Sequence, residues 1–287
     1  MAILKHLGGS LARFFAAGSC LVGCASGPEV QGNPSADGGG YVPLPDAGTV
    51  AVCRGNFDGV IARSEVVFVP GIEVRYRINP PSTLARVMPR GILNTDGTRT
   101  WDFADRTGDT VTLSLSTSAG QWWQSRFPTA QYASRIDPRS PNLGVYRAGD
   151  TSVELLGLVA PEESTMTVVP YEPGVPVLRF PLMMGATWTA DSTTRDAQVE
   201  GTPVASRDRY TFLVDARGTV RLPELTFRDA LRLRIELTQQ FPAGPGVRKI
   251  QYLWLVECYG EVARMTSQDG ELDPDFTSAL EFRRLGL

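Results

Sequence analysis

Short runs in which apolar and polar residues alternate recur along the chain from residue 52 onward. Residues 72–78 read Ile-Glu-Val-Arg-Tyr-Arg-Ile, and residues 110–116 read Thr-Val-Thr-Leu-Ser-Leu-Ser. Because successive side chains of a strand point to opposite faces, this period of two predicts strands with one buried and one solvated face. An apolar stretch at 60–69 comes just before the turn pair Pro70-Gly71, so we predict a further strand there.

The same period is stronger in the last third of the chain. Residues 231–238 alternate apolar with polar side chains without interruption, and residues 250–258 place Ile, Tyr, Trp, Val and Cys on one face. The opposite face of the second run carries Leu253 and Leu255, which predicts a central strand. Residues 210–214 and 220–222 flank Asp-Ala-Arg-Gly at 215–218, which predicts a hairpin with glycine at its turn.

Turn residues separate these runs at intervals of about 8–12 positions, and helical periodicity is nearly absent. We therefore predict an all-β domain at 51–287, either an antiparallel β-barrel-like fold or a sandwich. Residues 97–101 and 185–188 both contain a Gly and a Trp ahead of alternating strands. This echo suggests two similar halves, about 51–170 and 171–287, with a chance match as the alternative.

The first 23 residues have the features of a secretory signal. They carry Lys5, His6 and Arg13 and no acidic residue, and an uncharged run ends at Cys24. Leu-Val-Gly before Cys24 fits a lipobox, so residues 1–23 are predicted to be a lipoprotein signal peptide and Cys24 the lipidated first residue of the mature protein. The alternatives are lipidation at Cys20 and an ordinary cleaved signal with a chance cysteine.

Residues 24–50 are rich in Gly, Pro, Ser and Asp and lack apolar periodicity, which predicts a flexible tether between membrane and domain. A protein held by acyl chains at Cys24 has the membrane as its first partner. Ala25 follows the predicted lipidated residue, and it is not an acidic retention signal. We therefore expect a lipid-anchored protein of the cell envelope, with sorting to the outer membrane favoured.

Charge and histidine content exclude several classes of function. The chain has 28 Lys and Arg against 31 Asp and Glu, a net charge of −3, which gives no basic footprint for nucleic acid. Its only histidine is His6, inside the predicted signal. A mature chain without imidazole excludes Ser-His-Asp and Cys-His catalysis and the usual histidine-bearing metal sites. We predict no catalytic residue, no metal and no cofactor.

Two cysteines remain in the predicted domain, Cys53 and Cys258. Exported proteins form and keep disulfides because their compartment is oxidising. A Cys53–Cys258 bridge is therefore predicted, which would tie the start of the domain to a strand near its end. Two separate buried thiols are the alternative.

Three surface features are candidate binding sites. Trp122, Trp123 and Arg126 could form an aromatic platform for a sugar or lipid headgroup, although packing in the core or in a strand is the favoured interpretation of the two tryptophans. The acidic residues of 269–275 could hold calcium, but they lack EF-hand spacing and an exposed turn is the default interpretation. The arginines of the predicted hairpin are expected to lie on a solvated strand face; they are Arg207, Arg209, Arg217 and Arg221.

Residues 177–182 read Val-Leu-Arg-Phe-Pro-Leu and come shortly before Gly185 and Trp188, and residues 252–257 read Tyr-Leu-Trp-Leu-Val-Glu before Gly260. This combination resembles a group of uncharacterised envelope lipoproteins that are common in myxobacteria, over residues 97–283. The resemblance implies a β-rich envelope protein. The group has no assigned activity, so it gives no functional residue for this chain.

The sequence thus predicts a membrane-anchored, non-catalytic envelope lipoprotein whose β domain binds a lipid, a glycan or an envelope protein. One alternative is a carboxylate-based envelope hydrolase such as a glycan hydrolase, which needs two placed carboxylates in a cleft. Another is a structural component of a surface assembly, for which an exposed apolar patch would be the mark.

Overall fold

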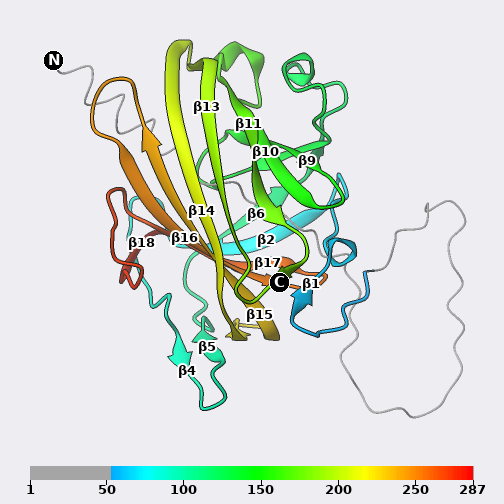
Figure 1. Cartoon of the computed structure of the whole chain (residues 1–287), viewed down its shortest axis with the longest axis vertical. Helices are drawn as coiled ribbons and strands as arrows, with labels where there is room; N and C mark the ends of the chain where they lie inside the picture. The colour runs from blue at the N-terminus through cyan, green and yellow to red at the C-terminus, as the bar shows by residue number, and fades with distance from the viewer. Residues whose placement is uncertain (1–52, 287) are drawn as a thin grey trace, which may run out of the picture.

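The computed structural model describes residues 53–286, and strands make up most of its regular structure (Figure 1). The strands of the first part are β1 (Val60–Ile61), β2 (Glu73–Ile78), β3 (Ala85–Arg86), β4 (Ile92–Leu93), β5 (Arg99–Asp102), β6 (Asp109–Ser114), β7 (Ser116–Thr117), β8 (Tyr132–Arg135) and β9 (Leu143–Ala148). Those of the second part are β10 (Ser152–Val159), β11 (Val168–Arg179), β12 (Leu182–Met183), β13 (Thr187–Val199), β14 (Thr202–Arg221), β15 (Thr226–Gln240), β16 (Val247–Val256), β17 (Gly260–Ser267) and β18 (Ser278–Leu285). Short 3-10 helices are η1 (Arg63–Glu65), η2 (Gln124–Arg126) and η3 (Glu163–Thr165).

A 16-stranded sheet curls into a nearly closed barrel (Figure 1). Its main path runs β6-β2-β18-β17-β16-β15-β14-β13-β11-β10-β9-β8-β7, and neighbours on this path pair antiparallel. Only Leu115 separates β6 from β7, so one stretch of chain pairs with β2 on one side and with β8 on the other. This joins the two ends of the path. The all-β prediction is confirmed, with a barrel-like sheet.

Apolar side chains fill much of the inner face. The register places Phe212 of β14 opposite Ile235 of β15 and Val214 opposite Leu233, and all four are buried. Trp188 of β13 stacks on Phe212 with 4.8 Å between the ring centroids. Burial of such aromatic and aliphatic groups contributes about 1.5–3 kcal/mol for each side chain. The alternation predicted for residues 231–238 therefore builds the core, as expected.

A cluster of charges is also buried inside the barrel, on β17 and β18. Glu261, Arg264, Glu281 and Arg283 are each at most 1% exposed. The Glu261 carboxylate accepts a hydrogen bond from Arg264 at 2.5 Å and one from Arg283 at 2.6 Å, and Arg283 lies 3.4 Å from Glu281. Burial lowers the pKa of Arg283, but the two carboxylates raise this pKa by more. The guanidinium therefore stays charged.

The outer face of β15 to β18 is covered by the segment between β2 and β6, residues 79–108. Its β3 pairs with β18, and its β5 pairs in parallel with the end of β14. Trp101 and Phe103 of this segment pack edge-to-face on Trp254, at 5.6 and 5.0 Å between ring centroids. Because Leu253 is buried on the opposite face, β16 is covered on both sides, as its sequence pattern predicts.

The hairpin predicted at 215–218 is wrong. β14 continues as one strand from Thr202 to Arg221, with two register shifts in its pairing to β15, and the chain turns only after it. Gly218 has a different role, because a Cβ at this position would lie 1.8 Å from the carbonyl oxygen of Arg99 in β5. Glycine here permits the close approach of a covering strand.

The strand predicted at 60–69 is also wrong over most of its length. β1 covers only Val60–Ile61, and the chain then forms η1. The Glu65 carboxylate turns back and accepts a hydrogen bond from the amide of Ala62 at 2.8 Å, which stabilises a turn where the strand would continue. The boundary drawn between the two predicted halves, at 170/171, lies inside β11, and strands of both ranges share one sheet.

The predicted disulfide is confirmed: Cys53 and Cys258 are bridged, with their Cα atoms 5.5 Å apart and a sequence separation of 205. Cys258 follows β16 at the turn to β17, so the bridge fastens the start of the described chain to the covered side of the barrel. The predicted signal peptide, Cys20, the lipidation site Cys24 and the tether lie outside the described residues. Within residues 53–286, no helix is long and apolar enough to cross a membrane.

Candidate functional site

Three prolines disturb β11 at every third position. They are Pro170, Pro173 and Pro176. Proline has no N–H, so inside a sheet it removes a ladder hydrogen bond. The pairing of β11 with β13 reaches Tyr171 and Glu172 and does not continue towards the end of β11, although both strands are fully described. The prolines therefore mark the place where two neighbouring strands separate.

Two buried side chains of β13 bridge this open seam. Trp188 donates its indole N–H to the carbonyl oxygen of Pro176, and Ser192 donates its hydroxyl to the carbonyl oxygen of Pro173, each at 2.8 Å. These bonds satisfy backbone carbonyls that a regular ladder would otherwise pair. They also hold β11 and β13 at a fixed separation, and this separation leaves a hollow on the outer face of the sheet.

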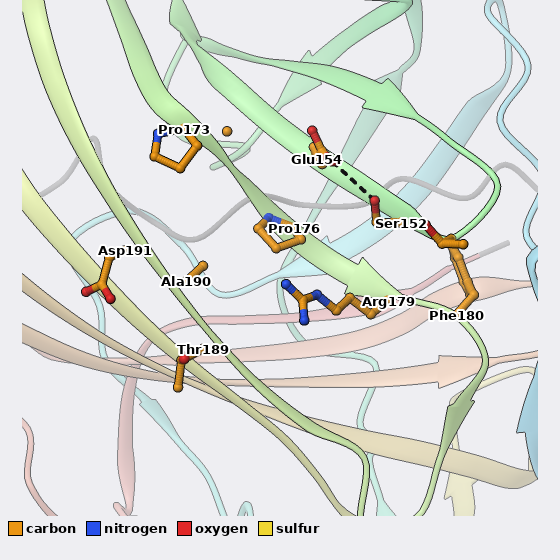
Figure 2. A pocket seen from close by; sticks show the side chains of 11 residues that line it. Ser152, Glu154, Pro173, Pro176, Arg179, Phe180, Thr189, Ala190 and Asp191 are labelled. Carbon is orange, nitrogen blue, oxygen red and sulfur yellow. Dashed lines mark hydrogen bonds between the residues drawn. The ribbon is translucent and has the colours of Figure 1, made fainter.

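We call this hollow the seam groove (Figure 2). Its volume is about 630 Å³. Pockets for small ligands measure about 300–1,000 Å³. Residues from β10, β11 and β13 and from the ends of these strands contribute to it. Its lining consists of Thr151, Ser152, Glu154, Pro173, Gly174, Pro176, Arg179, Phe180, Thr189, Ala190 and Asp191.

Both carboxylates of the seam groove have cationic partners. Glu154 accepts a hydrogen bond from Arg147 at 2.5 Å and another from Ser152 at 3.3 Å. Asp191 accepts two bonds from Arg209, at 2.7 and 3.3 Å. The hydrogen bonds from Arg209 lower the pKa of Asp191, so this carboxylate stays ionised in neutral solution. Each negative charge of the groove is thus balanced by an arginine beside it.

Arg179, the last residue of β11, is different. Its guanidinium is exposed, and within the described part of the chain it makes no side-chain hydrogen bond or ion pair. Figure 2 shows the side chain extending past Pro176 towards the strand that carries Thr189 and Asp191. The seam groove therefore contains an unpaired positive charge between two neutralised negative ones.

The tryptophans proposed as a ligand platform do not lie on a strand. Trp122 and Trp123 precede the 3-10 helix η2. Trp123 is fully buried and packs on Phe127, while Trp122 is partly buried and shares its indole N–H between the carbonyl oxygens of residues 160 and 161, each at 3.2 Å. Only Arg126 of this group is exposed. The three residues form no joint platform, because the turn of η2 directs Trp123 into the core.

The other sequence candidates fall outside the groove, with one exception. In the acidic loop, Asp269 pairs with Lys249 at 2.9 Å and Glu271 accepts backbone N–H bonds. Among residues 53–286, no group of three or more Asp, Glu, His or Cys side chains is placed to hold a metal ion. Arg209 is the exception, since it pairs with the groove carboxylate Asp191.

Sequence reasoning missed the seam groove. Its signal is the spacing of the prolines, because a Pro-x-x-Pro-x-x-Pro pattern within an otherwise strand-like stretch marks a break in sheet pairing. The sequence pattern of residues 177–188 predicted a structural resemblance only, and no binding site. In comparisons with known proteins, no family model, no curated sequence and no solved structure matches the chain.

Proposed function

We propose that this protein is a lipid-anchored envelope protein that catalyses no reaction and binds a ligand in the seam groove. The anchor rests on the lipobox ending at Cys24, and the tether on the composition of residues 24–50. The binding role rests on one observation above the others, the groove that the prolines of β11 open on the outer face of the sheet.

The sheet face is favoured over the barrel mouth because of what lies inside. The interior of β14 to β18 carries aromatic, aliphatic and paired charged side chains that are almost completely buried. A ligand entering there would have to displace packed groups, which costs several kcal/mol for each. The seam groove is already open to solvent, and its walls are fixed by backbone and by two partly buried hydrogen bonds.

A glycan hydrolase is the second candidate, because Glu154 and Asp191 both line the groove. Glycoside hydrolysis needs one carboxyl group with a raised pKa to protonate the leaving oxygen. The pKa of Asp191 is lowered by Arg209, and Glu154 is held by Arg147. These contacts favour binding over turnover. Incubation of the protein with envelope glycans, followed by mass spectrometry of the products, distinguishes the two candidates.

The anchor has its own test. In the native envelope, the Cys24→Ser variant should move from the membrane fraction to the soluble fraction, because the thiol that takes the acyl chains is gone. Cys20→Ser is the matched control and should remain membrane-bound. Membrane attachment of the Cys24→Ser variant would overturn the proposed anchor and leave the groove hypothesis to its own test.

The groove is tested with the soluble Cys24→Ser chain, expressed into an oxidising periplasm and measured by native mass spectrometry. We expect a bound mass of lipid or glycan size, which Thr189→Trp should abolish because an indole at this exposed lining position fills the groove. Thr226→Trp is the control, an equally exposed threonine at the start of β15. If the Thr189→Trp variant still carries the bound mass, the proposal is contradicted. If the soluble chain without this substitution carries no bound mass, a structural role in a surface assembly is favoured.

A further inference from the structure

The charges around the seam groove do not cancel. Glu154 is paired with Arg147 and Asp191 with Arg209, while Arg179 has no acidic partner in residues 53–286. Two neutral pairs and one free guanidinium leave the groove with one net positive charge. Such a site attracts an anion and rejects a second cation.

The donors beside Arg179 extend this preference. A guanidinium presents N–H groups in a fixed fork that matches the two oxygens of a carboxylate or a phosphate. Hydroxyl groups of Thr151, Ser152 and Thr189 line the same groove, and Figure 2 shows Ser152 and Thr189 on opposite sides of the Arg179 side chain. An anionic group held by Arg179 would therefore have hydroxyl donors and acceptors close by.

Apolar surface completes the lining. Pro173, Pro176 and Phe180 contribute rings that cannot hydrogen-bond through their side chains, and Ala190 adds a methyl group. A ligand that fits this combination needs an apolar face, several hydroxyl groups and one negative charge. A sugar ring with an acidic substituent has all three, because its C–H groups can pack on the rings while its hydroxyls reach the polar lining.

We propose that the seam groove binds an anionic sugar, with Arg179 contacting its carboxylate or phosphate and the proline rings packing on the sugar face. This inference rests on the proposed binding function of the groove and names the class of ligand. Arg179 acts here as the residue that selects charge, and the hydroxyl and proline lining selects the ring.

Isothermal titration of the full chain carrying Cys24→Ser tests the proposal with four probes. They are galacturonic acid, galactose 6-phosphate, galactose and inorganic phosphate. We expect one or both charged sugars to bind at least tenfold more tightly than galactose and than phosphate alone. Which of the two binds better identifies the anion as a carboxylate or a phosphate. Affinity should fall as salt rises, since the contact is partly exposed.

Arg179→Gln should lower the affinity for the charged sugar at least tenfold and leave the weak binding of galactose unchanged. Arg228→Gln is the control, an exposed arginine of β15 outside the groove lining, and it should change neither value. Equal affinity for galactose and the charged sugars, equal affinity for phosphate alone, or no measurable binding of either charged sugar would each overturn the proposal. Loss of a co-purified neutral ligand in Thr189→Trp would then still support the groove as a binding site.

Discussion

The barrel has a covered side, β15 to β18, and an open side, β9 to β13. On the covered side the segment 79–108 lies over the outer face, and β15 pairs with β16 without a register shift. On the open side the segment around η2 packs Trp123 and Phe127 against Val145 and Val159, but the outer face at the groove meets solvent. Register shifts interrupt the pairing of β10 with both its neighbours, and prolines open the seam beside β11. The pairings of β16 with β17 and of β17 with β18 also contain register shifts, so the two sides differ in how their outer faces are covered. The open side alone supplies the seam groove.

Buried charge differs between the two sides as well. Glu261 of the covered side is held by two arginines. Asp208 lies at the edge of the open side, on β14, and it is 2% exposed. Its carboxylate accepts hydrogen bonds from Gln239 at 3.0 and 3.2 Å, and among the described residues it forms no ion pair. Removing the carboxylate that two arginines share would leave uncompensated buried charge, whereas a buried carboxylate held by neutral groups alone itself costs stability.

The largest expected effect is on the covered side. Glu261→Gln removes the carboxylate that accepts the 2.5 Å hydrogen bond from Arg264, and it removes the closest carboxylate from Arg283. Breaking a buried pair in this way costs about 3–5 kcal/mol. Urea unfolding followed by tryptophan fluorescence should report this loss. Asp191→Asn on the open side is the control and should cost less than about 1 kcal/mol because its pair is exposed. Equal losses of unfolding free energy in the two variants would contradict the proposed difference in buried charge between the two sides.

Removal of the disulfide to the covered side should cause the next largest loss in the free energy of unfolding. Replacing both Cys53 and Cys258 by Ser frees a loop of 205 positions, and loss of a native disulfide commonly costs about 2–5 kcal/mol. The intact soluble chain should weigh about 2 Da less than its reduced form, since two thiol hydrogens are lost on oxidation. A double variant as stable as the parent would show that the bridge does not stabilise the barrel.

Replacement of Asp208 should stabilise the protein, whereas the two changes above should destabilise it. Burial raises its pKa from 3.8 to about 6, against the hydrogen bonds from Ser206 and Gln239 that lower it. The folded state thus binds this proton more tightly than the unfolded state, so the contribution of Asp208 to stability improves as the pH falls from about 6 towards 4. Asp208→Asn should raise the free energy of unfolding at pH 8 by about 3 kcal/mol, because about two pKa units are involved and each is worth about 1.4 kcal/mol.

The measurement is urea unfolding at pH 8 and pH 4.5. The gain from Asp208→Asn should shrink at the lower pH, where the native carboxyl group is protonated and resembles the amide. Asp191→Asn is again the control, since the pKa of Asp191 is lowered and this variant should show no gain at pH 8. A gain that is the same at both pH values would show that the carboxylate charge is not its cause.

Local pattern predicts the covered side well. Residues 231–238 alternate because one face of β15 packs into the apolar core while the other carries charged residues that form ion pairs. Residues 250–256 are apolar on both faces, apart from Gln251, because β16 is covered on both sides. The disulfide was predicted from the cysteine count together with the oxidising compartment that the predicted signal peptide implies. These features depend on each residue's own environment and need no knowledge of which strands meet.

The sequence did not predict features that depend on residues far apart in the chain. Gly218 looked like a turn residue, and its real neighbour is the backbone of Arg99, which is more than a hundred positions away in sequence. The seam groove depends on the prolines of β11 lying beside β13, and the pairing of these strands is not visible in local periodicity. The arginines of β14 lie largely on a solvated face, as expected, but the sequence did not predict that one of them, Arg209, neutralises the groove carboxylate Asp191.

The smallest effect on stability should come from Arg179, and this makes it the sharpest test of the comparison. Its guanidinium is exposed and has no hydrogen-bonding or ion-pair partner in the described chain, so Arg179→Gln removes neither kind of interaction. Surface substitutions of this kind stay within about 0.5 kcal/mol of the parent in unfolding free energy. The same variant should lose most of its affinity for a charged sugar. If Arg179→Gln loses binding and keeps the stability of the parent, Arg179 serves the groove and does not support the fold of the open side. A loss of more than about 1 kcal/mol in urea unfolding would instead show that Arg179 supports the fold of the open side.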